Sequence, residues 1–335
     1  MNISIIGCGR WGSLIAWYLS ARRGLSVTLY GRASSPHMER FLRERRNDLL
    51  TLPDEVRLVT TLDEAILPET EVVVISIGAQ GLRALMQELQ AYDLAGKTLV
   101  LCMKGLEEGT GKRLSEIAEE YVGPETSVAV WVGPGHVQEF YAGIPNCMVI
   151  DSRDEAVKHR LVEAFSGDII RFYFGTDLIG SEIGAAAKNV IGIAAGMLDG
   201  MGLTTLKGAL MSRGTREIAR LIAAMGGSEL SAYGLCHLGD YEATVFSRFS
   251  HNRAFGEAFV RGESYASLAE GYATVRALVL LGQEKGVDLP ICRAVYHILY
   301  SGADPKEELN HLFDRTIKTE FYSSVLRLKK EATPF

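Results

Sequence analysis

The fold is decided by the stretch Ile3-Ser4-Ile5-Ile6-Gly7-Cys8-Gly9-Arg10-Trp11-Gly12. Its β-branched start predicts a strand, and the amphipathic segment 11–23 that follows predicts a helix. A Gly-x-Gly-x-x-Gly pattern between a strand and a helix is typical of a turn that binds a dinucleotide. Gly7 permits the tight turn, Gly9 lets the backbone approach a pyrophosphate, and Gly12 allows the helix to pack closely on the strand.

The second predicted strand, 26–30, is followed by an arginine where a carboxylate is common. Domains that bind NAD usually place Asp or Glu about twenty residues after the glycines, where it binds the ribose 2′-hydroxyl. Arg32 in that place favours a 2′-phosphate, and therefore NADP over NAD. Four arginines in segment 37–50 either add to this positive field or form a solvated face balanced by nearby carboxylates. These arginines are Arg40, Arg43, Arg45 and Arg46.

Strand and helix patterns alternate through the first half of the chain. We predict strands near 3–6, 26–30, 72–76, 98–101, 127–132 and 147–150, with helices at 11–23, 80–90 and 112–120. Such alternation is typical of a parallel sheet. Helical segments at 181–199, 207–225 and 266–285 dominate the second half. The expected fold is α/β, with a Rossmann-like doubly wound domain at 1–179 and an all-α domain at 180–335.

Composition excludes several classes of protein. Lys and Arg number 35 against 41 Asp and Glu, a net charge of −6, so no global basic field attracts nucleic acid or a membrane. The five scattered cysteines fit neither a disulfide framework nor a zinc site. Apolar runs fall short of the roughly 18 residues of a membrane span. We expect a cytoplasmic protein without a metal, and a homodimer, the commonest soluble oligomer.

Lys188 lies among small and apolar residues. On a helix, its neighbours three and four positions away are Gly184, Ala185, Ile191 and Gly192. These would let a substrate approach and would partly desolvate the amine. Desolvation lowers the pKa of a lysine toward the range in which it exchanges a proton near neutral pH. A lysine that extends to solvent from a close-packed helix is an equal alternative.

Two further motifs follow predicted strands. Lys104 comes just after the strand at 98–101, and Gly133-Pro134-Gly135 comes just after the strand at 127–132. Ligands of open α/β sheets bind outside the carboxyl ends of the strands, so both motifs point to a cleft. The alternatives are an exposed turn lysine and a plain reversal of the chain.

Together these motifs resemble one family. Gly7–Gly12, Lys104–Glu107, Gly133-Pro134 and Lys188–Val190 occur in the order and spacing of the bacterial-type NAD(P)-dependent glycerol-3-phosphate dehydrogenases. The resemblance covers roughly residues 2–300. It implies reversible reduction of dihydroxyacetone phosphate to sn-glycerol 3-phosphate, a phospholipid precursor. Further matches are Ala194–Gly200, Ser212–Gly214, Leu238–Asp240 and Glu270–Tyr272.

The resemblance also implies the role of each matched residue. Lys188 resembles the general acid/base, and Lys104 resembles the lysine that polarises the substrate. Trp11 is a cofactor contact by position, although core packing is its alternative. The implied catalytic residues are Lys188, Lys104 and Asp240. The implied substrate-binding residues are Lys104, Gly133, Gly135, Lys188, Asp240, Thr244, Ser250, His251 and Asn252. The implied cofactor-binding residues are Gly7, Gly9, Arg10, Trp11, Gly12, Arg32, Lys104 and Glu270.

Two positions depart from the family pattern, and both concern the substrate. The family typically reads Ser-Arg-Asn where this chain has His251 in the middle, and that arginine binds phosphate with a bidentate fork. A neutral histidine offers fewer donors, so either phosphate binding is weaker or Arg248 or Arg253 substitutes. Gly135 stands where the family usually has Ser or Thr, so a hydroxyl contact to the substrate is missing.

These departures leave two alternative functions. One is a reductase of the same fold acting on another small phosphorylated or 2-oxo acid substrate, as in hydroxyacid dehydrogenases and ketopantoate reductases. Arg213 is a candidate partner for the carboxylate of such a substrate. The other is a non-catalytic regulator that binds NADP, which the presence of both Lys104 and Lys188 disfavours.

Overall fold

The apolar runs of the first half form one sheet. In the computed structural model, which describes residues 1–317 and 319–320, eight strands have the order β3-β2-β1-β4-β5-β6-β7-β8. The order reverses between β1 and β4, which is where doubly wound sheets bind dinucleotides. The strands are β1 Asn2–Ile6, β2 Ser26–Tyr30, β3 Arg57–Val59, β4 Val72–Ile75, β5 Thr98–Leu101, β6 Ser127–Val132, β7 Asn146–Ser152 and β8 Ile170–Phe174.

One strand pair is antiparallel, which corrects the expectation of a wholly parallel sheet. β7 runs against β6, with Ala129 opposite Ser152, whereas the neighbours on either side pair in parallel. The only helix in this connection is the five-residue α6, Val137–Tyr141. It spans about 7 Å, too little to return the chain along β6, which is about 20 Å long.

Two short strands were not predicted, β3 and β8. β3 has three residues and begins with the exposed Arg57. β8 leaves Arg171, Tyr173 and Phe174 exposed, so its apolar run does not resemble a strand buried on both faces. Each lies at an outer edge of the sheet. Edge strands bury less side chain than central strands, and their sequence signal is weaker for that reason.

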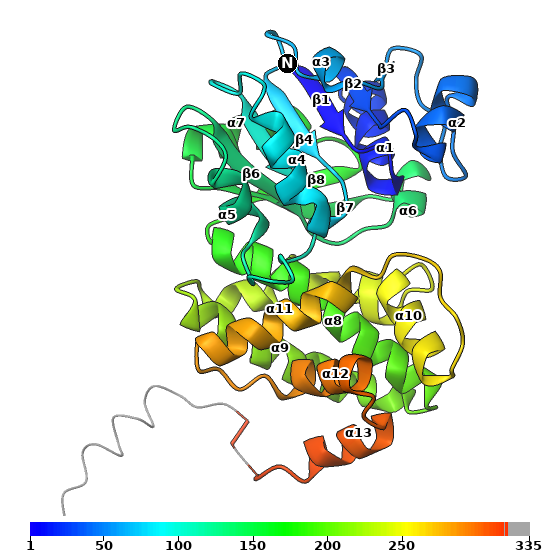
Figure 1. The fold of residues 1–335 in the computed structure, drawn as a ribbon, viewed down its shortest axis with the longest axis vertical. Coiled ribbons are helices and arrows are strands. Elements are labelled where there is room, and N and C mark those ends of the chain that lie inside the picture. The colour runs from blue at the N-terminus through cyan, green and yellow to red at the C-terminus, as the bar shows by residue number, and fades with distance from the viewer. Residues whose placement is uncertain (318, 321–335) are drawn as a thin grey trace, which may run out of the picture.

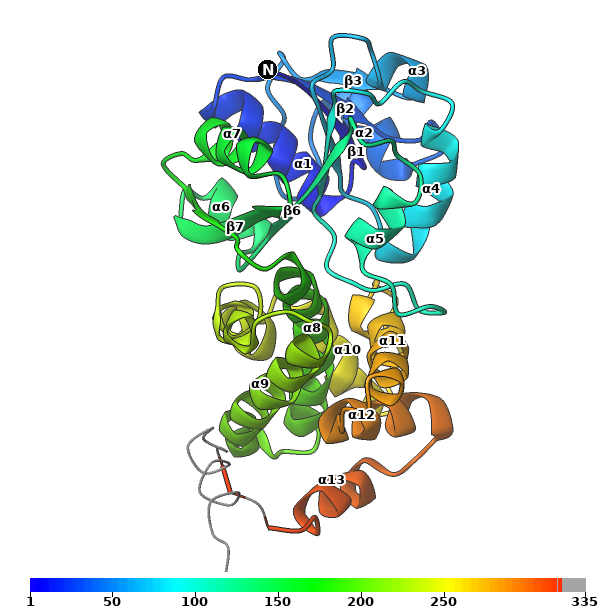
Figure 2. The ribbon, with the colours of Figure 1, turned by 90° about the vertical axis from the view of Figure 1, so that its left-hand side faces the viewer.

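Helices cover both faces of the sheet (Figures 1 and 2). α1 and α7 pack on one face, and α3, α4 and α5 pack on the other. The predicted helix at 11–23 is α1 followed by a π-helical turn, η1. The helices of this part are α1 Arg10–Trp17, η1 Tyr18–Arg22, α2 Pro36–Glu44, α3 Leu62–Ala65, η2 Ala79–Gly81, α4 Leu82–Leu89, α5 Leu114–Glu119, α6 Val137–Tyr141 and α7 Glu155–Phe165.

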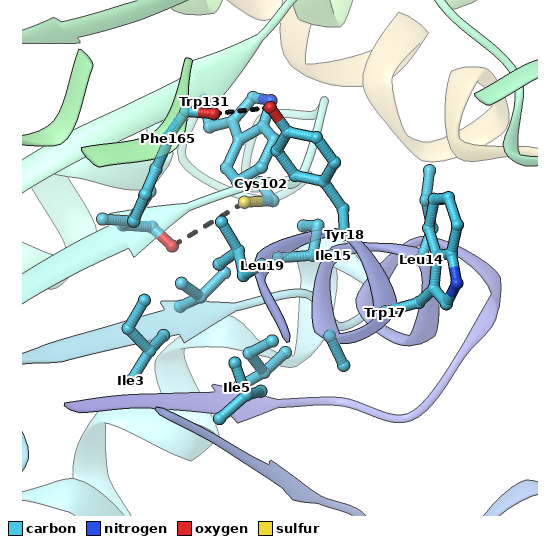
Figure 3. Packing of buried hydrophobic residues seen from close by; sticks show 14 of the residues in the cluster. Ile3, Ile5, Leu14, Ile15, Trp17, Tyr18, Leu19, Cys102, Trp131 and Phe165 are labelled. Atoms are coloured by element: carbon cyan, nitrogen blue, oxygen red, sulfur yellow. Dashed lines mark hydrogen bonds between the residues drawn. The ribbon is translucent and has the colours of Figure 1, made fainter. Parts of the chain in front are cut away.

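Aromatic side chains fill the core between α1, α7 and the sheet (Figure 3). The indole of Trp131 lies 5.5 Å from the ring of Phe165 and 6.5 Å from that of Tyr18, measured between centroids. Tyr18 is fully buried, and its hydroxyl donates to the carbonyl of Phe165 at 2.6 Å. A buried phenol without a partner would be costly, so this bond fixes η1 against α7.

The second half of the chain forms the helical part, with α8 at its centre (Figure 2). By length and composition α8 passes the test for a membrane span, but 89% of its apolar window is buried inside the protein, as expected of a core helix. The division predicted at 179/180 falls in the first turn of α8. The helices are α8 Leu178–Gly200, η3 Thr204–Leu206, α9 Lys207–Ala224, η4 Glu229–Tyr233, η5 Leu238–Asp240, η6 Glu242–Phe246, α10 His251–Val260, α11 Glu270–Glu284, α12 Pro290–Ser301 and α13 Pro305–Phe313.

Small residues let α10 lie directly on the backbone of α8. A Cβ on Gly196 would lie 1.9 Å from the carbonyl oxygen of Arg253, and one on Gly256 would lie 2.1 Å from that of Ile193. No side chain fits at either position. This close packing sets the distance from α8 to the start of α10, where Ser250 and His251 lie.

A buried ion pair ties α8 to the sheet-containing part. Arg113, at the start of α5, donates from Nη1 to Oε2 of Glu182 at 2.6 Å. Ser115 donates its backbone N–H to Oε1 of the same carboxylate at 2.8 Å. Both ionic side chains are almost fully buried. Such a pair tolerates the loss of one partner poorly, because the other charge is left unpaired.

We therefore expect Glu182→Ala to lower the free energy of unfolding by about 3–5 kcal/mol. Arg153→Ala, which breaks the exposed pair with Glu119, is the matched control and should cost less than about 1 kcal/mol. Urea unfolding followed by circular dichroism measures both. Equal small losses in the two variants would show that the buried pair does not hold the two parts together.

Candidate active site

A cleft of about 830 Å³ runs from the glycine turn to α8 and α10. Most residues expected at the site line it: Gly7, Gly9, Arg10, Trp11, Arg32, Lys104, Gly135, Lys188, Thr244, Ser250, His251, Asn252 and Glu270. Gly12, Gly133 and Asp240 lie behind its surface and contact residues that line it. Segments from both ends of the chain thus meet around one cavity.

The glycine turn leaves room for a ligand beside Gly9. Gly7 has a φ of +116°, and a Cβ there would lie 2.1 Å from the carbonyl oxygen of Ser76. A Cβ on Gly12 would lie 1.9 Å from the carbonyl oxygen of Gly7, so α1 packs against the turn itself. A Cβ on Gly9, in contrast, would meet nothing within 4 Å. This open strip of backbone at the start of α1 fits a pyrophosphate, and the residues present fit a dinucleotide cofactor.

Arg32 is exposed on the cleft just beyond β2. It has no carboxylate partner among the ion pairs formed within residues 1–317 and 319–320. The four arginines that follow it do form such pairs. Their partners are Glu44 and Asp48 for Arg40, Glu44 for Arg43 and Arg46, and Asp54 for Arg45. They form the balanced solvated face, and Arg32 is the one of these five arginines that lines the cleft.

Trp11 and Glu270 are two further lining residues that were expected to bind the cofactor. The indole of Trp11 is half-buried, lines the cleft and packs on Phe140, with ring centroids 6.0 Å apart. Its packing role is observed, and its contact with the cofactor stays a prediction. Glu270 begins α11, and its Oε1 accepts from the backbone N–H of Ala79 at 3.3 Å. Burial raises the pKa of the Glu270 carboxyl above its usual value.

Two lysines that line the cleft share one carboxylate oxygen. Oδ2 of Asp240 lies 2.8 Å from Nζ of Lys104 and 2.9 Å from Nζ of Lys188. Lys104 also donates to the carbonyl of Gly133 at 2.6 Å, and Lys188 to Oγ1 of Thr244 at 2.8 Å. Residues from the sheet edge, α8 and the η5–η6 segment therefore form one network.

Burial lowers the pKa of Lys188 to about 8, and the nearby Lys104 ammonium acts in the same direction. Asp240 opposes them and keeps the charged form accessible. The direction of this pKa shift agrees with the prediction from the sequence, but the small neighbours of Lys188 do not have the predicted role of admitting the substrate. A Cβ on Gly184 would meet His237 at 3.1 Å, and one on Gly192 would meet Thr244 at 2.7 Å. These glycines accommodate the packing of the helical part and do not open a path for the substrate.

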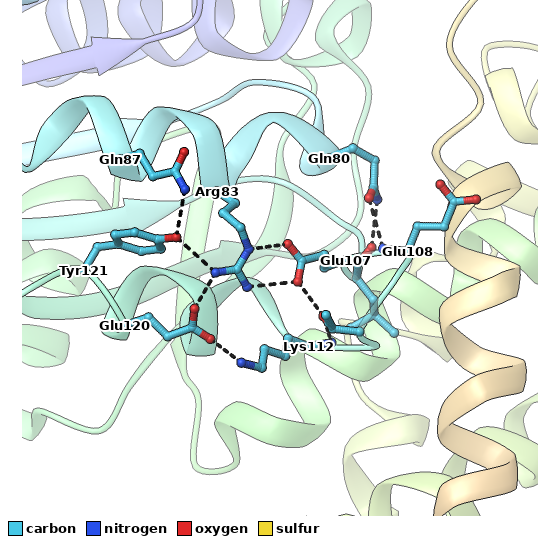
Figure 4. Close-up of polar contacts among 10 residues, drawn as sticks. Gln80, Arg83, Gln87, Glu107, Glu108, Lys112, Glu120 and Tyr121 are labelled. Atoms are coloured by element: carbon cyan, nitrogen blue, oxygen red, sulfur yellow. Dashed lines mark hydrogen bonds and ion pairs between the residues drawn. The ribbon is translucent and has the colours of Figure 1, made fainter.

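A network around Arg83 holds the segment that carries Lys104 (Figure 4). The guanidinium of Arg83 donates to both carboxylate oxygens of Glu107, at 2.6 and 2.9 Å. Gln80 fixes the same segment by donating to the carbonyl of Leu106 at 2.8 Å and accepting from the backbone N–H of Glu108 at 3.0 Å. These bonds leave the loop little freedom, so the Lys104 side chain starts from a fixed backbone.

Gly135 has a structural reason to differ from the family. Its φ is +143°, and a Cβ there would lie 2.1 Å from the ring of Phe140, so neither Ser nor Thr fits. The next residue, His136, lines the cleft and was not among the expected site residues. Burial, chiefly, lowers its pKa to about 4, so the ring is neutral. Its buried Nε2 has no hydrogen-bond partner within the described part of the chain.

The arginines expected to replace the family's phosphate ligand do not line the cleft, which corrects that expectation. Arg253 pairs with Asp199 at 3.0 Å and Glu257 at 2.7 Å. Arg248 lies over the ring of Phe249, 4.9 Å from its centroid, and is exposed. The arginine that does reach His251 is Arg10, whose Nη1 contacts Nε2 of that ring.

The remaining substrate positions are connected to the lysine helix. Asn252 donates to Oδ1 of Asn189 at 3.0 Å, and Asn189 donates to the carbonyl of Lys104 at 2.8 Å. Ser250 caps α10 by accepting from the backbone N–H of Arg253. Arg213, the candidate partner for a free carboxylate, lies outside the cleft on α9 and pairs with Glu320 at 3.6 Å.

Comparison with known proteins gives consistent matches along the chain. The family described as NAD-dependent glycerol-3-phosphate dehydrogenase matches with its N-terminus at residues 2–158 and its C-terminus at 177–310. A glycerol-3-phosphate dehydrogenase [NAD(P)+] of Chlorobium limicola is 36% identical over 337 residues, covering 96% of this chain and 100% of the relative.

Solved structures agree. Glycerol-3-phosphate dehydrogenase of Coxiella burnetii superposes with a TM-score of 0.86 at 26% identity, over 94% of this chain and 99% of that one. A probable 2-dehydropantoate 2-reductase of Bacillus subtilis shares the fold alone, with a TM-score of 0.58 at 15% identity over 90% of this chain and 99% of that one. The chain belongs to the NAD-dependent glycerol-3-phosphate dehydrogenase family.

Proposed function

We propose that this enzyme interconverts dihydroxyacetone phosphate and sn-glycerol 3-phosphate with NAD(P)H, and that Lys188 is its general acid and base. The observation that carries this proposal is the pair of ammonium groups on Asp240, in the same cleft as a glycine turn that fits a dinucleotide. Membership of the family supports the same reaction.

The two lysines have different roles at the carbonyl group of the substrate. A reduced nicotinamide bound in the cleft supplies the hydride. The ammonium of Lys104 lies where it meets the negative charge that develops on the carbonyl oxygen, and a fixed cation in a cleft lowers that barrier more than water does. Lys188 donates the proton that completes the alcohol. In the reverse direction its neutral amine accepts that proton, and a pKa of about 8 makes both forms available near neutral pH.

Asp240 is a positioning residue. It is 1% exposed and lies behind the two lysines, so it acts on the substrate through them. Its charge offsets the repulsion between two ammonium groups and raises the pKa of Lys188 from the value that burial alone would give. Without this carboxylate the pKa of Lys188 would be lower, so less of the side chain would be in the ammonium form that acts as an acid.

On the substrate side, Ser250, Asn252 and His136 line the cleft. His136 offers an unsatisfied ring nitrogen one residue from Gly135, where the family usually has a hydroxyl. We assign it the lost contact with a substrate hydroxyl. On the cofactor side, the exposed Arg32 favours the extra phosphate of NADPH.

The direct test is an absorbance assay of purified protein with dihydroxyacetone phosphate and either NADPH or NADH. We expect oxidation of both cofactors, with NADPH preferred because Arg32 faces the cleft. Lys188→Ala should lower kcat by about 10²- to 10⁴-fold and keep NADPH binding, since the lysine acts on the proton.

Retained turnover in Lys188→Ala would contradict its role as the general acid and base. Binding of NADPH by the wild type without oxidation of either cofactor would support the non-catalytic regulator instead. Oxidation only with an unphosphorylated 2-oxo acid would indicate the alternative substrate class.

The pH dependence separates the role of Asp240 from a purely structural one. For reduction, kcat/KM should fall above about pH 8, as the Lys188 ammonium loses its proton. Asp240→Asn removes the charge that raises this pKa, so the fall should begin about one to three pH units lower. Asp168→Asn, which removes an exposed carboxylate outside the cleft, is the control and should leave the profile in place. A lower rate with an unshifted profile would contradict the positioning role.

The homodimer and the cytoplasmic location remain predictions from the sequence. We place the expected dimer contact on the helical part, and light scattering after gel filtration measures the assembly directly.

A further inference from the structure

Arg10 and His251 meet across the cleft from opposite ends of the chain. Arg10 begins α1 beside the glycine turn, and His251 begins α10 in the helical part. Nη1 of Arg10 contacts Nε2 of His251, and Nδ1 of the same ring lies 2.7 Å from Oη of Tyr265. Both Arg10 and His251 line the cleft.

The chemistry of these groups sets the direction of each hydrogen bond. A guanidinium has only donors, so Nε2 of His251 accepts from Arg10. The proton of a neutral imidazole is then on Nδ1, which donates to Tyr265. Burial and the charge of Arg10 lower the pKa of His251, in agreement with a neutral ring. Both ring nitrogens are therefore used, and His251 has no N–H left for an anion.

Arg10 has the properties that His251 lacks. It forms no ion pair with a carboxylate within residues 1–317 and 319–320, unlike Arg253, which has two. Its guanidinium has five N–H donors, and the contact with His251 uses one of them. The planar fork of a guanidinium matches a phosphate, which it binds with two parallel hydrogen bonds.

We propose that Arg10, oriented by His251, supplies the guanidinium that binds a phosphate group in this cleft, in place of the arginine that the family carries at position 251. The cleft therefore still has a guanidinium for the phosphate, but it is carried by α1 and not by α10. This inference rests on the proposed function, which places two phosphate groups near Arg10. They are the phosphate of the substrate, beside Ser250 and Asn252, and the pyrophosphate of the cofactor, beside Gly9.

Calorimetry on Arg10→Ser tests this proposal without turnover. sn-Glycerol 3-phosphate is titrated into protein saturated with NADP⁺, and NADPH is titrated into free protein. We expect at least one dissociation constant to rise about 10- to 100-fold, as for loss of a hydrogen-bonded charge. A rise for sn-glycerol 3-phosphate alone identifies the substrate phosphate, and a rise for NADPH alone identifies the cofactor phosphates. Arg22→Ala removes an exposed guanidinium at the end of η1 and should change neither constant.

An exchange of residues separates this role from general damage. Arg10→Ser with His251→Arg returns the guanidinium to the family's position, so it should restore the lost affinity to within about fivefold of the wild type. His251→Arg alone should not tighten binding, because two adjacent guanidinium groups repel each other. Thermal unfolding of each variant checks that it is folded.

Dissociation constants within twofold of the wild type for both ligands in Arg10→Ser would overturn the proposal. So would a loss that the exchanged pair does not restore. If the wild-type protein neither binds sn-glycerol 3-phosphate nor turns over dihydroxyacetone phosphate, the proposed function fails separately. Inorganic phosphate and NADPH then serve as probes of Arg10, with the same expected loss in Arg10→Ser.

Discussion

One carboxylate oxygen holds the active site together. Oδ2 of Asp240 accepts from Lys104 and Lys188, two ammonium groups that would repel each other without it. Because Asp240 is almost fully buried, water cannot take over this role. Each of the three residues comes from a different segment, so the arrangement requires the sheet edge, α8 and η5 to meet accurately. The buried Arg113–Glu182 pair fixes α8 against the sheet-containing part, and the bonds of Arg83 to Glu107 fix the loop of Lys104.

Much of this arrangement could be predicted from the sequence, and the failures have physical causes. The bounds of β2, β5 and β6 match the prediction because their β-branched runs are buried centrally or lie between clear turns. The predicted parallel direction of β7 was wrong, because the residue pattern of a strand carries no information on the direction of its neighbour. Lys188 and Lys104 were found from local patterns, whereas Asp240 entered only through the family resemblance. The contact of Arg10 with His251 spans 241 positions, and no local pattern encodes it.

The substrate end differs from the family at two positions, and the structure gives a reason for each. Phe140 occupies the space that a side chain at Gly135 would need, and the next residue, His136, lines the cleft and has a buried Nε2 without a hydrogen-bond partner among the described residues. His251 has both ring nitrogens engaged and contacts Arg10. Beside each position that lost a polar group of the family lies another polar side chain: His136 next to Gly135, and Arg10 against His251. Lys188, Asp240 and the glycine turn keep the family pattern, so these changes lie outside the groups that we propose act at the carbonyl.

Burial lowers the pKa of Lys188 toward neutral pH, and the charge of Asp240 opposes this shift. The most direct test is the pH dependence of acetylation of Lys188 by acetic anhydride, quantified by mass spectrometry, because only the neutral amine reacts. We expect the Lys188 side chain to react with a pKa of about 8. A value near 10.4, that of a lysine in water, would contradict it, since an amine with that pKa would remain protonated throughout the neutral range.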